Sequence, residues 1–280
     1  MPLKLMYITN RPEVAVIAEK SGVDRVFVDL EYIGKSLRQG GMDTVQNHHT
    51  ASDVKKLKKF ITGAKLVARI NPIHEADVEK KFKGTEKEVA EVIKAGADIV
   101  MLPYFKTADE VRRFISAVKG RARTMLLFET PEAVENIDEI LSVEGIDEVF
   151  IGLNDLSLGY GDKFMFKPLA DGKVDKIVEK FKAKKLPYGF GGIASLGRGA
   201  LPSEKIIAEH YRLGSTCVIL SRSFCNTGLI DNIDVINMTF KNGVKEIREF
   251  ERYCKNQIDL FYKENRKSLK KIVEEICKQV

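Results

Sequence analysis

The sequence predicts an α/β fold, a single (β/α)8 TIM barrel, and three observations carry that prediction. Short apolar, β-branched runs alternate with amphipathic segments along the whole chain. There are eight such runs, and their starts lie between 22 and 40 residues apart, the length that one strand–helix unit requires. The 280 residues are also the usual length of one eightfold barrel.

The predicted strands are continuous apolar runs, as expected of parallel strands that are covered on both faces. Eight units in a row favour a closed barrel over an open doubly wound sheet. The turn after the first run reads Thr9-Asn10-Arg11-Pro12, so it lacks the glycine-rich dinucleotide fingerprint of such sheets. The predicted strands span residues 3–9, 25–30, 65–70, 98–104, 124–129, 148–153, 188–193 and 216–221.

Helix signals follow several of these strands. Thr107 and Glu110 form a capping-box pattern before 108–118. Pro131 opens a predicted helix over 132–141. Gly214 ends one that begins near Ser203. The stretches 31–52 and 156–172 are predicted to be long loops, which in compact domains are usually functional.

The chain is predicted to form one domain over residues 1–280, with a C-terminal helical extension over 242–280. Apolar residues from Val244 to Phe261 recur at helical spacing, and this part can serve as the eighth barrel helix. The stretch 268–280 is a further amphipathic helix. Two roles are open for it: packing on a neighbouring subunit of a homo-oligomer, or folding back on its own barrel.

Composition excludes several classes of protein. The formal charge of +6 comes from interleaved acidic and basic residues, which is not a nucleic-acid-binding pattern. No apolar stretch approaches ~18 residues, and the start has no signal-peptide pattern, so we expect a cytoplasmic protein that does not enter a membrane. The four cysteines lack metal-ligand spacing and are expected to be reduced thiols.

Two acids directly follow neighbouring predicted strands. Glu129 ends the fifth run and Asp155 follows the sixth. Because barrel chemistry takes place at the carboxyl ends of strands, the two are expected side by side. Carboxylates that close require a cation or a shared proton, and oxygen ligands favour Mg²⁺ or Mn²⁺. Gly152 would allow close approach of backbone or substrate. The alternative for Glu129 is a cap on the helix that begins at Pro131.

A cation is predicted at the same rim. Arg69 ends the third run, where its alternation with apolar neighbours directs it into the barrel mouth. There it could neutralise charge that develops on a substrate oxygen, or it could only form an internal ion pair. Asp29 and Glu31, at the end of the second run, are expected to orient it.

The loop after the second run offers candidates for a general base. It contains Tyr32, His48 and His49, and the chain has only four histidines. A Schiff-base lysine is disfavoured, because the strand ends five to eight carry none. A phosphate cradle around Gly189, Gly191 and Gly192 is a further open alternative, against simple relief of crowding.

Several segments together resemble the HpcH/HpaI aldolase and citrate lyase β-subunit family of the phosphoenolpyruvate/pyruvate barrel superfamily. The resemblance covers roughly residues 20–225. Its most specific parts are FVDLE, VARIN, ADIVMLPYF, FETPEAVENIDEIL and GIDEVFIGLNDLSLGYG.

The resemblance implies a metal site and a substrate site. Glu129 and Asp155 would hold the metal, and Arg69 would contact a substrate oxygen. Glu31 matches an acid of the family, and backbone amides near Asn154 and Asp155 would bind a substrate carboxylate. One position departs from the family, because aldolases of this type typically have histidine where this chain has Tyr32.

These observations predict a divalent-metal-dependent carbon–carbon lyase or aldolase. It would act on a small keto acid or related acyl substrate through a pyruvate-like enolate, and the resemblance implies a homo-oligomer. The departure at Tyr32 leaves Tyr32, His48 and His49 as alternative bases. It also keeps two other functions open: a CoA-ester lyase of the citrate lyase type, and a non-catalytic binding protein on a retained barrel.

Overall fold

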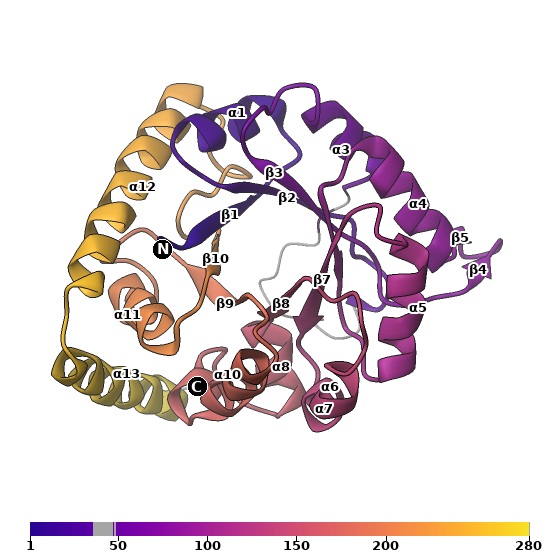
Figure 1. Cartoon of the computed structure of the whole chain (residues 1–280). Coiled ribbons are helices and arrows are strands. Elements are labelled where there is room, and N and C mark those ends of the chain that lie inside the picture. The colour runs from indigo at the N-terminus through magenta and orange to yellow at the C-terminus, as the bar shows by residue number, and fades with distance from the viewer. Residues whose placement is uncertain (36–46, 48, 280) are drawn as a thin grey trace.

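Eight parallel strands close into a barrel in the computed structural model, which describes residues 1–35, 47 and 49–279 (Figure 1). Each predicted strand is present, with ends that differ by at most two residues. Neighbours in the chain are neighbours in the barrel, and the last strand pairs with the first. The strands are β1 (Lys4–Ile8), β2 (Arg25–Asp29), β3 (Lys65–Arg69), β6 (Ile99–Leu102), β7 (Arg123–Phe128), β8 (Glu148–Ile151), β9 (Tyr188–Ile193) and β10 (Cys217–Leu220).

Every second strand residue points into the barrel, which stacks the interior in layers. The middle layers are apolar and fully buried, for example Met6, Phe27 and Phe150. Two residues further along the same strands, the inward positions reach the mouth. Asp29 lies there two residues after Phe27, and Gly152 lies two residues after Phe150. The period of the strands therefore places the rim residues above a closed apolar plug.

The opposite end of the barrel holds a buried ion pair. Both carboxylate oxygens of Glu148 accept hydrogen bonds from Arg25 Nη2, at 2.9 and 2.7 Å. Arg123 adds a contact of 3.2 Å from its Nε. Arg25 and Glu148 are almost fully buried. This floor cluster (Arg25, Arg123 and Glu148) fills inward positions below the apolar layers.

Helices ring the barrel, and those with predicted starts near 108, 131 and 203 begin there (Figure 1). Thr107 caps its helix by accepting from the amide of Glu110, and Gly214 ends another in the left-handed conformation. No helix in the part of the chain described by the structure is long and apolar enough to cross a membrane. The helices are α1 (Pro12–Lys20), α3 (Ala51–Leu57), α4 (Thr85–Ala95), α5 (Ala108–Val118), α6 (Pro131–Glu135), α7 (Ile137–Ile140), α8 (Leu153–Gly159), α9 (Lys167–Ala170), α10 (Lys173–Ala183), α11 (Ser203–Leu213), α12 (Ile233–Lys255) and α13 (Asp259–Gln279).

Two local predictions were wrong, and one small element was not predicted. The single helix expected over 132–141 is two short helices, because the backbone leaves the helical range at Asn136 (φ −90°, ψ 14°). The loop expected over 156–172 contains the end of α8 and all of α9. Its polar composition hid α8, which buries Leu153 and Leu156 on one face. A small hairpin, β4 (Ala76–Asp77) and β5 (Phe82–Lys83), was not predicted.

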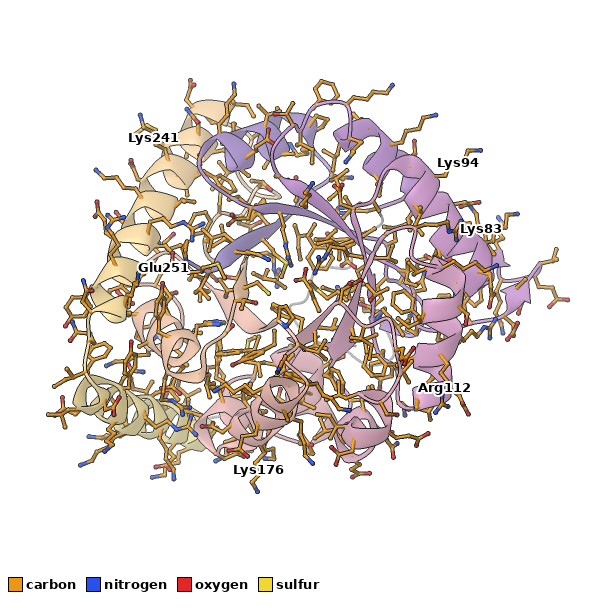
Figure 2. The ribbon with its side chains drawn as sticks, viewed as in Figure 1. Lys83, Lys94, Arg112, Lys176, Lys241 and Glu251 are labelled. Carbon is orange, nitrogen blue, oxygen red and sulfur yellow. The ribbon has the colours of Figure 1, made fainter. Side chains whose placement is uncertain are left out.

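The eighth barrel helix begins earlier than expected, at Ile233 rather than near 242. α12 packs on α1 and α11. Its Glu251 points inward, and its Oε1 accepts from the amide of Leu3 at 2.6 Å, whereas Lys241 of the same helix points outward (Figure 2). The N-terminal strand is therefore tied directly to α12.

α13 packs on α11 and α9 of its own barrel. The contact centres on Glu209, a fully buried acid of α11. Its Oε2 contacts Arg266 Nη1 at 3.0 Å and Arg212 Nη2 at 2.7 Å, and its Oε1 accepts from Asn265 Nδ2 at 3.1 Å. Both arginines also pair with Asp175. We call these five residues the C-terminal clamp. A role for α13 in a homo-oligomer stays a prediction.

Candidate active site

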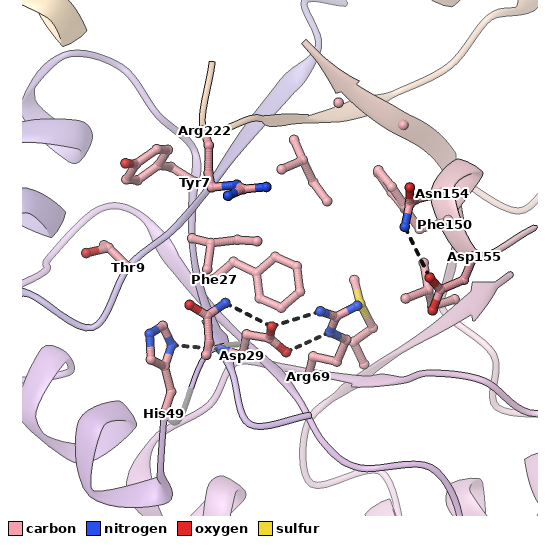
Figure 3. Close-up of a pocket in the computed structure, with 18 of the residues that line it drawn as sticks. Tyr7, Thr9, Phe27, Asp29, His49, Arg69, Phe150, Asn154, Asp155 and Arg222 are labelled. Carbon is pink, nitrogen blue, oxygen red and sulfur yellow. Dashed lines mark hydrogen bonds and ion pairs between the residues drawn. The ribbon is translucent and has the colours of Figure 1, made fainter. Parts of the chain in front are cut away.

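A cavity of about 440 Å³ opens at the carboxyl ends of the barrel strands (Figure 3). Arg69 at the end of β3 and residues that follow β1, β2, β7, β8 and β10 line it, and Phe27 and Phe150 form part of its floor. The predicted site residues Arg69, Glu129 and Asp155 lie in its wall. This arrangement brings together, in one cavity, side chains that are up to 86 residues apart in the chain.

Asp29 and Arg69 form a two-pronged ion pair on one side of the cavity (Figure 3). Arg69 Nε donates to Asp29 Oδ1 and Arg69 Nη2 donates to Asp29 Oδ2, both at 2.8 Å. Burial alone would raise the pKa of Asp29, but the charge and hydrogen bonds of Arg69, with Lys35, hold it well below its ordinary value. Burial alone would lower the pKa of Arg69, but Asp29 and Glu31 raise it well above its usual range. The pair is therefore charged across the physiological pH range.

Three further groups complete this cluster. Arg69 Nη1 lies 3.2 Å from Glu31 Oε2. Lys35, which is buried, lies 3.1 Å from Asp29 Oδ2 and 3.4 Å from Glu31 Oε2. Asn47 Nδ2 donates to Asp29 Oδ2 at 3.0 Å. We call Asp29, Glu31, Lys35 and Arg69 the mouth cluster. Arg69 is thus both ion-paired and in the cavity wall.

Glu129 is buried directly after β7, where Tyr104 donates a hydrogen bond to it and Gly152 leaves room for it. Its Oε1 accepts from the amide of Tyr104 at 3.0 Å. Tyr104 holds a left-handed backbone (φ 50°), a strained conformation for a residue with a side chain. A Cβ on Gly152 would lie 2.6 Å from Glu129 Oε2 and 2.8 Å from Glu129 Cβ. Gly152 therefore makes room for Glu129. The helix that follows is capped by Thr130, so Glu129 is not its cap.

Asp155 and Asn154 lie in the first turn of α8, across the cavity from Asp29 (Figure 3). Asp155 is buried, with 8% of its surface exposed, and Asn154 Nδ2 donates to its Oδ1 at 3.3 Å. Because β8 ends at Ile151 and Gly152 caps α8, the chain turns directly from the strand into this helix. That turn holds Asp155 in the cavity wall that Glu129 also lines.

The donor set of this wall fits a divalent cation. Within the described residues, no group of three or more His, Cys, Asp or Glu side chains could hold a metal ion. Zinc sites built wholly from protein ligands therefore have no match there. Mg²⁺ usually takes only one or two carboxylates from the protein and completes its shell with water and substrate oxygens. Glu129 and Asp155, with the space that Gly152 leaves beside Glu129, provide such a partial set.

His49 reaches the cavity, but in a form that limits its chemistry. Its Nδ1 accepts from the amide of Asp29 at 3.1 Å. A ring whose Nδ1 accepts a hydrogen bond carries its proton on Nε2 when neutral, so Nε2 donates rather than accepts. His49 is therefore placed as a hydrogen-bond donor. The other candidate of this pair, His48, lies outside the described residues.

Tyr32 does not line the cavity that holds Glu129 and Asp155. It lies in a second cavity of about 200 Å³, which it shares with His74 and Glu88. The cause is a turn at the end of β2, where Asn71 Oδ1 accepts from the amides of Tyr32 and Ile33, both at 2.9 Å. Burial raises the pKa of Tyr32, which further disfavours it as a base.

Sequence reasoning missed several residues of the cavity. Lys35 was seen only as part of a loop. Arg222 lies two residues after β10, so the rule that led to Glu129 would also have found it. Arg11 reaches the cavity from the loop after β1. Gly189 was noted for phosphate, but a Cβ there would lie 2.4 Å from Cys217 O, so this glycine relieves crowding.

Comparisons with known proteins identify the family of this chain. The family HpcH/HpaI aldolase/citrate lyase matches residues 4–183. The 2-keto-3-deoxy-L-rhamnonate aldolase of Escherichia coli O17:K52:H18 (strain UMN026 / ExPEC) is 27% identical over 157 residues, which are 45% of this chain and 58% of that protein. The protein of the same name from Escherichia coli O6:K15:H31 (strain 536 / UPEC) is 30% identical over 125 residues, 33% of this chain and 47% of that one. The matches thus span about half of these relatives.

Solved structures share the fold over most of the chain. The HpcH/HpaI aldolase from Desulfitobacterium hafniense DCB-2 covers 89% of this chain and 93% of its own, with a TM-score of 0.57 and 18% identity. The HpcH/HpaI aldolase/citrate lyase family protein from Burkholderia cenocepacia J2315 covers 88% of this chain and 95% of its own, with a TM-score of 0.60 and 15% identity. The citrate synthase SbnG covers 81% of this chain and 90% of its own, with a TM-score of 0.58 and 17% identity. The chain belongs to the HpcH/HpaI aldolase/citrate lyase family, whose members are aldolases and lyases.

Proposed function

We propose that this protein is a divalent-metal-dependent aldolase or carbon–carbon lyase that acts on a keto acid through the enolate of a pyruvate-like unit. The observation that carries the proposal is the pair of buried carboxylates, Glu129 and Asp155, in the wall of one cavity with Arg69. The match to a family of aldolases and lyases supports the reaction class.

Glu129 and Asp155 would hold the cation, Mg²⁺ or Mn²⁺. When bound, it supplies Lewis-acid stabilisation of the charge that develops on a substrate oxygen. Arg69 adds a fixed positive charge on the other side of the cavity. Because Asp29 holds this guanidinium by two hydrogen bonds, it does not have to reorganise during the reaction. The backbone amides near Asn154 and Asp155 would position the substrate carboxylate.

The reaction transfers one proton and breaks or forms one carbon–carbon bond. In the cleavage direction the β-hydroxyl loses its proton, the bond between the two halves breaks, and its electron pair forms the enolate. The enolate carbon then takes a proton, which gives pyruvate and an aldehyde. Water takes the β-hydroxyl proton. Lys35, whose ammonium lies within 3.4 Å of both Asp29 and Glu31, is the cavity residue that we propose to give a proton to the enolate carbon and to regain one from water. His49 would donate a hydrogen bond to the β-hydroxyl oxygen.

Decarboxylation of oxaloacetate tests the proposal without knowledge of the natural substrate. It generates the same pyruvate enolate and needs no aldehyde. We expect the purified protein to decarboxylate oxaloacetate with added Mn²⁺ or Mg²⁺ and to lose the activity with a chelator. Glu129→Gln and Asp155→Asn should each reduce the rate on the order of 10³-fold, since the metal supplies several kcal/mol of stabilisation.

Glu132→Gln is the matched control. Glu132 is a half-buried acid three residues after Glu129, paired on the surface with Lys106. This variant should keep the wild-type rate and metal affinity, as measured by calorimetric titration with Mn²⁺. Full metal-dependent turnover in both Glu129→Gln and Asp155→Asn would refute the proposal. Metal binding without any turnover would instead favour the non-catalytic binding protein.

A further inference from the structure

Asn71 continues the hydrogen bonding of the sheet beyond the ends of β2 and β3. Where the two strands end, the amide of Leu30 donates to Arg69 O at 2.9 Å. The amides of Tyr32 and Ile33 then donate to the side-chain Oδ1 of Asn71, both at 2.9 Å. One buried side chain therefore takes the place of a strand partner for the turn at the end of β2.

This turn carries two members of the mouth cluster. The amide of Lys35 donates to Tyr32 O at 3.2 Å, and the left-handed backbone of Gly34 (φ 73°) allows the turn to close. Lys35 Nζ then lies 3.1 Å from Asp29 Oδ2 and 3.4 Å from Glu31 Oε2. The position of the ammonium at the cavity therefore depends on the position of the turn.

Glu88 of α4 holds Asn71 from the side away from the turn. Its Oε1 accepts from Asn71 Nδ2 at 2.8 Å, and its Oε2 accepts from the Asn71 amide at 3.2 Å. Two donors on one residue require two acceptor oxygens, which a carboxylate has and a carboxamide does not. Because Nδ2 is bound to Glu88, the oxygen of the Asn71 side chain faces the turn. Glu88 thus fixes which end of that side chain the turn meets.

The start of α4 is itself anchored, so Glu88 is a firm support. The amide of His74 donates to Thr85 Oγ1 at 2.9 Å, and the amide of Thr85 donates to His74 O at 3.1 Å. Glu88 lies in the first turn of this helix and is buried, and burial raises its pKa. Since an apolar side chain would pack there without the penalty of a buried charge, the carboxylate indicates a positioning role.

We infer that Glu88 is a positioning residue: through Asn71 it fixes the turn at the end of β2 and so holds Lys35 at the cavity. The part that concerns the proton of Lys35 rests on the proposed function. Glu88 and Asn71 do not line the 440 Å³ cavity, and both line the second cavity of about 200 Å³. They would therefore act through Lys35 and not by touching substrate. A displacement of about 1 Å at a reacting group can cost ~10²-fold in rate.

The test compares two reactions that differ in their need for Lys35. The first is the exchange of the methyl hydrogens of pyruvate in D₂O with Mn²⁺, followed by NMR. The amine of Lys35 takes a proton from the methyl carbon, the resulting ammonium exchanges with solvent, and a deuteron returns to the enolate carbon. The second is decarboxylation of oxaloacetate, in which the carbon–carbon bond breaks without a proton from the enzyme.

Glu88→Gln leaves one of the two Asn71 donors without an acceptor, and Asn71→Asp places two carboxylates against each other. Each variant should slow the exchange of pyruvate about tenfold or more, and decarboxylation less than about threefold. The double variant with Asn71→Asp and Glu88→Gln interchanges the amide and the carboxylate, so both hydrogen bonds can form again. It should recover most of the lost exchange rate, which is not expected of residues that only fill space.

Asn265→Asp is the matched control, because Asn265 Nδ2 donates to another buried glutamate, Glu209, at 3.1 Å in the C-terminal clamp. This variant should lose stability without slowing either reaction. Equal losses in both reactions for the variants at Asn71 and Glu88, or a double variant no faster than the single ones, would overturn the inference. So would a wild type that decarboxylates oxaloacetate but does not exchange pyruvate.

Amide hydrogen exchange, measured by mass spectrometry, separates this inference from the proposed function because it needs no reaction. The peptide that covers residues 30–35 should exchange about tenfold faster in Glu88→Gln than in Asn265→Asp, and the double variant should return it to the wild-type rate. If this holds while oxaloacetate is not decarboxylated, the positioning of the turn stands and the proposed function fails. Unchanged exchange of this peptide in both single variants would refute the positioning role even in an active enzyme.

Discussion

The floor cluster and the mouth cluster use the same chemistry at opposite ends of one barrel. On β2, Arg25 and Asp29 flank Phe27 at inward positions, one facing each end. On β8, Glu148 and Gly152 flank Phe150 in the same way. A buried arginine paired with a buried acid therefore does not by itself indicate a catalytic site.

The clusters differ in what adjoins them. Neither Arg25 nor Glu148 lines the 440 Å³ cavity, and the apolar layers separate both from it. The mouth cluster adjoins that cavity and faces two further acids, Glu129 and Asp155, across it. We therefore expect the floor cluster to set stability and the mouth cluster to set activity, as is usual for the two faces of such barrels.

The largest expected effect is on stability, at the floor. Glu148→Ala would leave Arg25 buried without its carboxylate partner, which costs about 3–5 kcal/mol. Urea unfolding followed by circular dichroism measures this loss. The remaining folded protein should decarboxylate oxaloacetate at the wild-type rate. A clearly reduced rate of decarboxylation in the folded variant would contradict the division between a floor cluster for stability and a mouth cluster for activity.

Arg69→Ala should have nearly as large an effect, but on the rate. Removal of a fixed charge that faces a developing oxyanion typically costs about 10²- to 10³-fold. Asp29 would keep Lys35 and Asn47 as partners, so the loss in unfolding free energy should be smaller than for Glu148→Ala. Steady-state decarboxylation and urea unfolding on the same sample give both numbers. A normal rate with a large loss of stability would place Arg69 with the floor residues.

Gly152→Ala should weaken metal binding about tenfold. The added methyl group would lie 2.6 Å from Glu129 Oε2, so the carboxylate has to move. Gly192→Ala is the control, because its Cβ would lie 3.5 Å from the nearest atom and Gly192 also lines the cavity. Calorimetric titration with Mn²⁺ compares the two. Equal affinities in the two variants would show that the room beside Glu129 is not needed for the metal.

A pH dependence outside both clusters sharpens the comparison. His210 of α11 is buried and stacks on Phe190 at 3.8 Å, and burial lowers its pKa to about 3. Between about pH 6.5 and 3 the unfolded chain binds a proton there that the folded chain does not. Stability should therefore fall as the pH falls, by at most ~1.4 kcal/mol per unit.

The lowered pKa of Asp29 acts only at lower pH, since its stabilising effect is complete above its unfolded pKa of about 4 and is lost below it. Urea unfolding of the wild type and of His210→Gln at pH 7, 6 and 5 isolates the contribution of His210. His210→Gln should remove the slope over this range. A slope that persists in the variant would assign it to another group.

Much of the fold could be predicted because it depends on local pattern. Parallel strands covered on both faces are apolar throughout, and their spacing sets the barrel. Glu129 and Arg69 could be found because a strand end in a barrel is also the rim of the cavity. Arg222 was missed although it satisfies the same condition at β10.

Other features depend on contacts between distant segments, which a single sequence does not reveal. Tyr32 turns away from the cavity because the side-chain oxygen of Asn71, 39 residues later, accepts a hydrogen bond from the Tyr32 amide. The need for Gly152 becomes visible only when Glu129 is placed beside it. α8 forms because Leu153 and Leu156 are buried in spite of polar neighbours, so local propensity predicted a loop there.

The C-terminal clamp has a consequence for how the protein is made. Glu209 is synthesised 57 residues before Arg266, its partner from α13. At about 5–20 residues per second, a nascent chain waits roughly 3–11 s before that arginine exists. During that interval the acid of α11 lacks one of its two cations, and the part of α11 on which α13 packs is uncovered. This contact is therefore among the last to form as the chain is made, and a premature stop between the two residues would prevent it permanently.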